Sequence, residues 1–225
     1  NIGSGDITWL DIIKHICTKG KPVILASGAS SLSDVELAMA VISESGNPSV
    51  LMQCNTNYTA AENNFDYINL NVLKTYREKF PDVILGLSDH THGCSSVLGS
   101  VALGARVIEK HFTDSCEREG PDHKFSMNPK TWRDMVDRSR ELEASLGNGT
   151  KMVEENEKET VVLQRRALRA TRKLSANNKI QEGDLFPLRP CPEDAIKPAE
   201  LKNIINKELI NDIPEGEVIK WNDLK

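Results

Sequence analysis

Two histidines each come soon after a short apolar run, and their side chains could bind a metal ion. His90 follows the run 83–87 (VILGL) after a Ser-Asp pair, and His111 directly follows the run 105–110 (ARVIEK). Both runs are typical of buried parallel strands, and the small-residue pattern at 95–104 favours a helix between them. Polar residues at the carboxyl ends of neighbouring parallel strands build the active sites of α/β proteins. Two imidazoles placed there could share one divalent metal ion.

A third histidine leaves an alternative metal pair open. A single histidine at a strand end is more often structural than functional, so it is the pair that favours a site. His92 forms an HxH pair with His90, and residues i and i+2 of a strand face the same side. His92 nevertheless comes after Thr91 and next to Gly93, where we expect a loop. We therefore favour His111 as the partner of His90.

The other expected strand ends carry small polar side chains. They are Ser4 and Asp6 in the GSGD stretch, Ser27, Thr56 with Tyr58, and Ser88. Each one taken alone is more often part of an ordinary turn. Together they predict a polar bowl that suits phosphate and hydroxyl groups. Asp122, in the segment 120–124 (GPDHK), fits a plain turn and a functional loop equally well.

Alternating elements must position these groups. Short apolar runs predict strands at 1–4, 22–25, 49–53, 83–87 and 105–110. Periodic apolar residues predict helices at 10–18, 33–44, 69–80, 95–104 and 129–146. Ser33 with Glu36 predicts a capping box at the start of the second helix. About five βα units indicate a parallel sheet or barrel. Because a sheet that starts on residue 1 has an unpaired edge, we expect the C-terminal part of a longer chain.

The pattern changes after about residue 149. Residues 150–166 are highly charged and predict a linker helix, and residues 167–225 predict a small β-rich domain. Two similar turns, 180–184 (IQEGD) and 213–217 (IPEGE), place Gly183 and Gly216 where a positive φ is wanted. Arg189 lies in this domain before a proline, and its position alone predicts no function.

Composition excludes several classes of function. The net charge is −5, and 27% of the residues are charged without a basic tail, which disfavours nucleic acid as a partner. No apolar stretch approaches the roughly 20 residues that span a bilayer. The five cysteines are scattered and never form CxxC, which favours reduced thiols over disulfides or structural zinc. We therefore expect a cytoplasmic protein that acts away from membranes.

Several motifs, in this order, resemble one enzyme family. The stretches IGSGD, PVILASGAS, LGLSDHT, ALGARVIEKHFT and GPDHKFSMNP resemble the sialic acid (nonulosonic acid) synthases. The tail, with its paired glycine turns and LRP, resembles the antifreeze-like SAF domain that is fused to those synthases. The resemblance covers the whole chain. It implies the C-terminal portion of a TIM-type (β/α) barrel, residues 1–149, followed by the linker and the SAF domain.

The resemblance implies a metal-assisted condensation. In the family, phosphoenolpyruvate condenses with an N-acetylhexosamine-type aldehyde, either N-acetylmannosamine or a diacetamido-trideoxyhexose, and phosphate is released. A divalent ion, manganese or magnesium, polarises the aldehyde. By match of motif, His90 and His111 would be the metal ligands, and Asp6 would be the acidic residue near the metal. These three residues form the expected catalytic set.

The resemblance also assigns substrate contacts. Ser4 and Ser88 would contact phosphoenolpyruvate, and Tyr58 and Asp122 the sugar. Arg189 would reach the acyl group of the sugar from the partner subunit of a domain-swapped homodimer.

Three positions depart from the family pattern. Asn1 stands where many relatives carry a phosphate-binding lysine, and Ala26 replaces a serine for which Ser27 could substitute. Thr56 occupies a substrate-binding position where relatives vary between Ser, Asn and Thr.

The family's first three strands, with a catalytic glutamate and a lysine, have no counterpart in the sequence. We therefore expect the chain alone to be inactive or poorly folded. Two alternatives stay open. One is another metal-dependent barrel enzyme, such as an HxH hydrolase. The other is a truncated, non-catalytic sugar-binding remnant.

Overall fold

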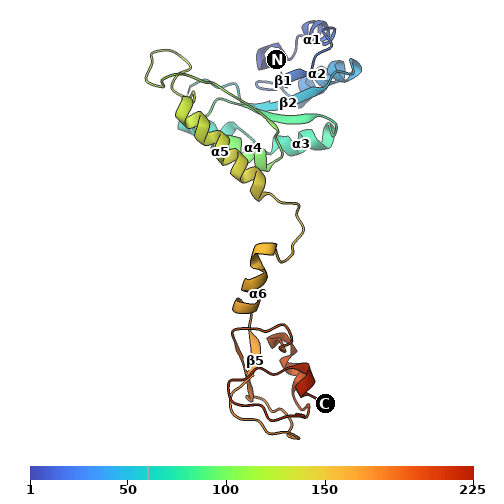
Figure 1. The fold of residues 1–225 in the computed structure, drawn as a ribbon. Coiled ribbons are helices and arrows are strands. Elements are labelled where there is room, and N and C mark those ends of the chain that lie inside the picture. The colour runs from blue at the N-terminus through green and yellow to red at the C-terminus, as the bar shows by residue number, and fades with distance from the viewer. Residues whose placement is uncertain (60) are drawn as a thin grey trace. The chain divides into compact units, whose positions relative to one another are not determined.

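The chain divides into two compact units, which are described separately. The computed structural model describes residues 1–59 and 61–225, and the units are Asn1–Gly149 and Thr150–Lys225 (Figure 1). Each unit has its own cluster of buried apolar side chains. Among the described residues, no helix combines the length and the apolar character that a membrane crossing requires.

A parallel sheet forms the centre of the first unit. Its strands, in spatial order, are β1 (Val23–Ala26), β2 (Ser49–Cys54), β3 (Ile84–Asp89) and β4 (Val107–Lys110). All neighbours are parallel, as the sequence predicted. The expected first strand is reduced to one residue. Ile2 forms a parallel bridge with Leu25, and the chain then turns into a 3-10 helix, Ser4–Asp6.

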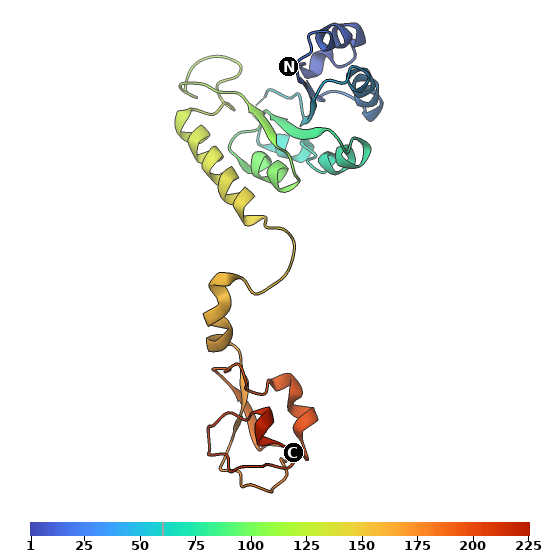
Figure 2. The ribbon, with the colours of Figure 1, turned by 45° about the vertical axis from the view of Figure 1, so that its right-hand side comes forward.

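Helices connect the strands and cover one face of the sheet (Figure 2). They are α1 (Leu10–Cys17), α2 (Leu32–Glu44), α3 (Val72–Lys79), α4 (Ser95–Ala102) and α5 (Pro129–Ser145), with a 3-10 helix at Glu62–Tyr67. The strand residues Leu25, Leu51 and Leu85 pack against helix residues such as Ile42 and Leu73. Since side chains alternate across a strand, the opposite face carries a separate cluster made only of strand residues.

Two helices begin at residues other than the predicted ones. The N-cap of α2 is Ser31 and not Ser33: Ser31 Oγ accepts from the Asp34 amide at 3.3 Å, and the Asp34 carboxylate accepts from the Ser31 amide at 2.8 Å. An Asp three residues after a serine thus supplies the reciprocal bond that Glu36 was expected to supply. Helix α3 begins at Val72 and not at residue 69, because Asn69 has a φ of 49°, which is incompatible with a helix.

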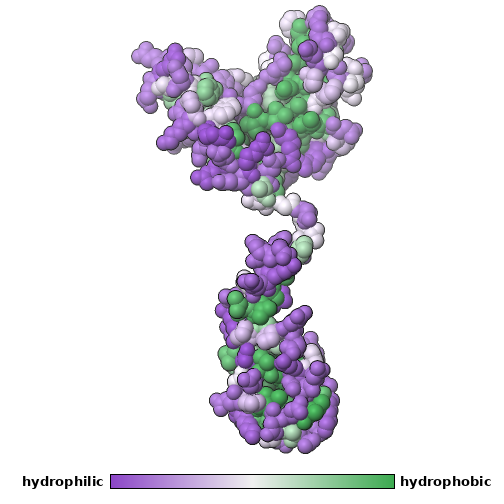
Figure 3. Space-filling model, viewed as in Figure 1, coloured by the Kyte–Doolittle hydropathy of each residue, from purple (hydrophilic) through white to green (hydrophobic). Residues whose placement is uncertain are grey.

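The second unit is small and mostly irregular. After a 3-10 turn it contains α6 (Lys158–Gln164), β5 (Ala167–Ala170), antiparallel β6 (Leu185–Leu188) and α7 (Leu201–Ile204). Its core includes Leu168, Ile180, Ile196, Ile204 and Ile219. Gly183 and Gly216 have φ values of 91° and 82°, which confirms the two predicted turns. Figure 3 shows apolar surface on α6, where Val162 and Leu163 are exposed.

Candidate active site

The two predicted histidines lie next to each other at the ends of neighbouring strands. His90 follows β3, His111 follows β4, and the centroids of their rings are 5.1 Å apart. Strand pairing explains this proximity, because Asp89 and Lys110, the residues just before them, are paired in the β3–β4 register. Phe125 is buried beside both rings, with centroid distances of 6.0 Å to His90 and 5.0 Å to His111. The ring centroid of Tyr58 lies 4.2 Å from that of His90.

An oxygen atom lies near Nδ1 of each imidazole. The Nδ1–H of His90 donates to the backbone carbonyl of Asn55 at 2.8 Å. The Nδ1 of His111 lies 3.6 Å from a carboxylate oxygen of Asp122. Metal-binding histidines are usually held in this way, with one nitrogen on a carbonyl or carboxylate and the other on the metal. The arrangement leaves the Nε2 atoms for a ligand.

The two rings differ in basicity. Burial lowers the affinity of His90 for a proton, but contacts with the Cys54 thiol and the Asn55 carbonyl outweigh this effect, so the pKa of His90 is raised. Burial, and then repulsion from His90, lower the pKa of His111, although Asp122 and Glu109 partly offset them. The site therefore combines one more basic and one less basic imidazole.

A carboxylate that the sequence analysis did not single out lies on the same face of β4 as His111. Glu109 accepts a hydrogen bond from Ser88 Oγ at 2.8 Å and another from the Asn1 side-chain amide at 2.6 Å. The i, i+2 spacing of Glu109 and His111 is the signal that could have revealed it, because such residues share a strand face. Glu109, near the end of β4, thus links Ser88, near the end of β3, with Asn1.

A second polar group gathers around Gly28, just after β1. The Gly28 amide donates to Ser4 Oγ at 2.9 Å. A Cβ on Gly28 would lie 1.9 Å from Thr56 Oγ1 and 2.8 Å from Ser4 Oγ, so this position has room only for glycine. Cys54, one of the five cysteines predicted to be reduced thiols, lies 3.9 Å from His90 Nδ1. Burial raises its pKa, but hydrogen bonds with His90, Ser4 and Ser88 outweigh burial, and the pKa of the thiol is lowered.

Not every predicted residue joins these groups. Ser27 is buried on the helix side of the sheet, where its hydroxyl donates to the Met52 carbonyl at 2.8 Å and accepts from Tyr76 at 2.9 Å. Strand alternation explains this, because Ala26 belongs to the opposite face. Asp6 is exposed in the 3-10 helix Ser4–Asp6. Within residues 1–59 and 61–225, no three His, Cys, Asp or Glu side chains are arranged as a metal site, so Asp6 is not gathered with the two histidines.

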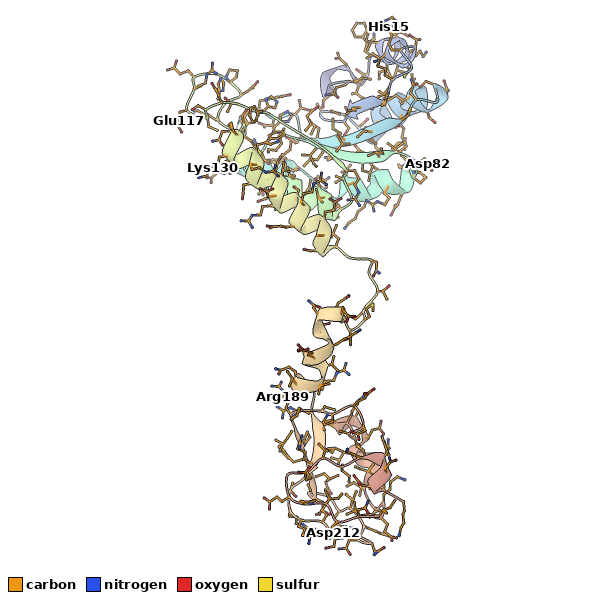
Figure 4. All side chains as sticks on the ribbon, viewed as in Figure 1. His15, Asp82, Glu117, Lys130, Arg189 and Asp212 are labelled. Atoms are coloured by element: carbon orange, nitrogen blue, oxygen red, sulfur yellow. The ribbon has the colours of Figure 1, made fainter. Side chains whose placement is uncertain are left out.

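Arg189 lies in the second unit, near the end of α6 (Figure 4). Its Nε donates to the Gln164 carbonyl at 2.7 Å, and the Arg189–Pro190 peptide bond is cis. The hydrogen bond engages one of the three guanidinium nitrogens, while the residue remains exposed.

Both units of the chain match known families. Residues 1–151 match the NeuB family, and residues 165–225 match the SAF domain. The chain belongs to the NeuB family. In this NeuB-family chain, the two histidines and the polar groups around Glu109 and Gly28 all lie in the part that matches the family.

Related proteins and structures agree with this assignment. The NeuB-family chain is 33% identical to an N,N'-diacetyllegionaminic acid synthase of Legionella pneumophila, over 100% of the chain and 63% of that protein. It is 35% identical to an uncharacterized protein of Methanocaldococcus jannaschii, over 99% of the chain and 65% of that protein. The chain thus spans less than two thirds of the length of these relatives.

A solved structure supports the same fold. An N-acetylneuraminic acid synthetase from Leptospira borgpetersenii, crystallised with citrate, matches with a TM-score of 0.64 and 30% identity, over 71% of the chain and 55% of that protein. The predicted partial (β/α) barrel followed by a SAF domain is therefore confirmed.

Proposed function

We infer that this chain provides the metal- and phosphoenolpyruvate-binding part of a nonulosonic acid synthase. The proposed reaction joins phosphoenolpyruvate to an amino-sugar aldose such as N-acetylmannosamine or a diacetamido-trideoxyhexose. The relatives support this class of product, since those with assigned names include legionaminic, pseudaminic and N-acetylneuraminate-9-phosphate synthases.

One observation carries the proposal: two imidazoles at neighbouring strand ends, with ring centroids 5.1 Å apart. Each of them turns Nδ1 toward an oxygen acceptor, namely the Asn55 carbonyl and the Asp122 carboxylate. Two nitrogen donors fit a divalent manganese or magnesium ion that acts as a Lewis acid. Water and substrate oxygens would occupy the remaining coordination positions of the ion. His90 and His111 would hold this ion, which supplies polarisation of the aldehyde oxygen when bound.

The proposed condensation balances in atoms and charge. The methylene carbon of phosphoenolpyruvate forms the new bond to the aldehyde carbon, and the aldehyde oxygen takes up a proton. Water adds to the resulting cationic carbon and gives up one proton, which balances the proton taken up by the aldehyde oxygen. The bond between that carbon and the phosphate oxygen then breaks, and phosphate leaves with the electron pair. The new hydroxyl loses its proton to the phosphate as the carbon becomes the keto carbon of the sugar acid.

The chain's own side chains have proposed roles around these atoms. Ser4 and Ser88 are small hydroxyl donors at strand ends, which suits the phosphate and carboxylate of phosphoenolpyruvate. Ser88 shares its hydroxyl with Glu109, so we propose that Glu109 releases it when the substrate binds. Tyr58 and Asp122 adjoin the imidazoles and would contact the sugar. Thr56, which lies beside Gly28 as Ser4 does, completes the proposed polar site. Asp6 and Ser27 have no proposed role in it, because Asp6 is exposed and Ser27 is bonded on the helix side of the sheet.

We propose that Arg189 acts on the sugar bound by a second copy of the chain. In a domain-swapped homodimer, the guanidinium of Arg189 from one chain would contact the acyl group of the sugar bound by the other chain. The hydrogen bond from its Nε to Gln164 supports a fixed presentation of the terminal nitrogens.

The position of His92 argues against the HxH hydrolase alternative. Its ring makes an edge contact with Phe65, at a centroid distance of 5.1 Å, and the side chain is exposed. His92 and His111 therefore offer a matched pair of substitutions, because the two enzyme hypotheses assign the metal to different partners of His90.

Formation of the keto acid product tests the proposal. Purified protein is supplied with manganese, phosphoenolpyruvate and each candidate aldose. We expect phosphate release and product formation that His111→Ala abolishes and His92→Ala leaves within about twofold, since ligand loss removes the Lewis acid. The reverse pattern would support the HxH enzyme. Binding of the sugar without any turnover would support the non-catalytic remnant.

A further inference from the structure

A buried ion pair lies directly behind the two histidines. Lys110 Nζ is 2.7 Å from Asp89 Oδ2, and both side chains have zero exposure to solvent. Both belong to the described part of the first unit, on the neighbouring strands β4 and β3. The proposed chemistry uses neither of them.

The pair belongs to a closed hydrogen-bond network. Lys110 Nζ also donates to the Thr91 carbonyl at 2.5 Å. The Asp89 carboxylate accepts from the Thr91 amide at 3.0 Å and from Thr91 Oγ1 at 2.8 Å. Thr91 Oγ1 further contacts Ser96 Oγ, in the first turn of α4, at 3.2 Å. The network therefore ties β4 to the turn that follows His90.

Each partner is the immediate chain neighbour of one histidine. Asp89 precedes His90, Lys110 precedes His111, and Asp89 and Lys110 are paired in the register of the sheet. Because successive side chains of a strand point to opposite faces, the ion pair faces the helices while the imidazoles face the site. A shift of either strand end would move an ion-pair partner and a histidine together.

Stability alone does not explain a charged pair at this place. Desolvation of two charges costs about as much as their attraction returns, and apolar residues of similar size often serve as well or better. A fully bonded ion pair does restrict geometry, because it has one favourable arrangement. We propose that Asp89 and Lys110 are positioning residues that set the spacing and orientation of His90 and His111.

The metal part of this inference rests on the proposed function, so the test includes a measurement that does not. The variant Asp89→Asn/Lys110→Met removes both charges and keeps an acceptor for Thr91. Ile108→Val is the matched control: Ile108 neighbours the pair in β4 on the same face, and the change removes one methyl group without touching the network. Each protein is checked for folding by circular dichroism and thermal melting. Ring signals of the histidines are recorded by NMR without metal, and manganese affinity is measured by electron paramagnetic resonance.

We expect the folded double variant to lose the wild-type ring signals of His90 and His111 and to bind manganese about tenfold or more weakly, the usual effect of losing support behind a ligand. Ile108→Val should keep both properties. Unchanged ring signals and a manganese affinity within about twofold of wild type, in a folded double variant, would overturn the inference. If wild type binds no manganese, the proposed function fails, while the ring signals still decide the positioning role. If the double variant does not fold, Asp89→Asn alone is tested by the same criteria. The expected loss of manganese affinity is then smaller.

Discussion

The two histidines of the candidate site occupy different environments. His90 is buried beside the Cys54 thiol and donates to the Asn55 carbonyl, which together raise its pKa against the effect of burial. Burial, and then repulsion from His90, lower the pKa of His111. A pair of this kind takes up protons in two separate steps.

We predict that His90 protonates first as the pH falls. Its raised pKa places its charge change above the ordinary histidine value of about 6.5, and the lowered pKa of His111 places that change below it. Near pH 6.5 the metal-free protein should therefore hold charged His90 and neutral His111. Long-range proton–nitrogen NMR of the rings, with a chelator present and His111→Ala for assignment, measures both midpoints. A reversed order of protonation would contradict these environments.

The positions of some site residues could be predicted from the sequence, and those of others could not. The placement of His90 and His111 was predictable, because short apolar runs fixed the two strand ends. The position of Ser27 on the helix side of the sheet was not predictable. In a strand of only four residues, an error of one residue in the register moves every side chain to the other face. Glu109 and Cys54 were missed because single carboxylates and thiols are common, and only tertiary packing brings them beside the imidazoles.

At the scale of elements, strand β3 approaches its neighbours closely enough to require a glycine. A Cβ on Gly86 would lie 2.7 Å from the Val107 backbone oxygen and 2.7 Å from Met52 Cγ. The backbone oxygen belongs to β4 and cannot turn aside as a side chain would. The spacing of the strands that carry the two histidines therefore depends on this residue.

We predict that Gly86→Ala destabilises the first unit by about 1–3 kcal/mol, the usual cost of overpacking. Gly99→Ala is the matched control, because its Cβ would meet only the flexible end of Leu70 and helix propensity favours alanine there. Urea unfolding of both variants, with equal m-values, measures the difference. An unchanged midpoint for Gly86→Ala would contradict the packing described for β3.

Element types were more predictable than element limits. The alternation of strand and helix in the first unit followed from apolar periodicity and is confirmed. The start of α3 was not predictable, because the left-handed conformation of Asn69 depends on its surroundings. Likewise, two serines with acidic residues three positions later compete to cap α2, and the sequence does not rank them.

At the scale of the whole molecule, each unit encloses an apolar core of its own. The core of the second unit contains Ile196, which has zero exposure, and the core of the first contains Leu51, also with zero exposure. The two clusters share no residue.

We predict that Ile196→Ala weakens the second unit by about 2–5 kcal/mol and leaves the first unit unchanged, because the cavity forms in one core only. Leu51→Ala should have the opposite selectivity. Hydrogen exchange read by mass spectrometry reports protection in each unit separately. Equal loss of protection in both units for either variant would show that the chain unfolds as a single cooperative body.

We propose above all that His90 and His111 hold one divalent metal ion between them. Isothermal titration of manganese into the metal-free chain tests this without requiring turnover. We predict saturable binding with one site per chain, lost in His111→Ala and retained in His92→Ala within about twofold. Absence of saturable binding to the folded wild-type chain, or an identical curve for His111→Ala, would contradict the claim.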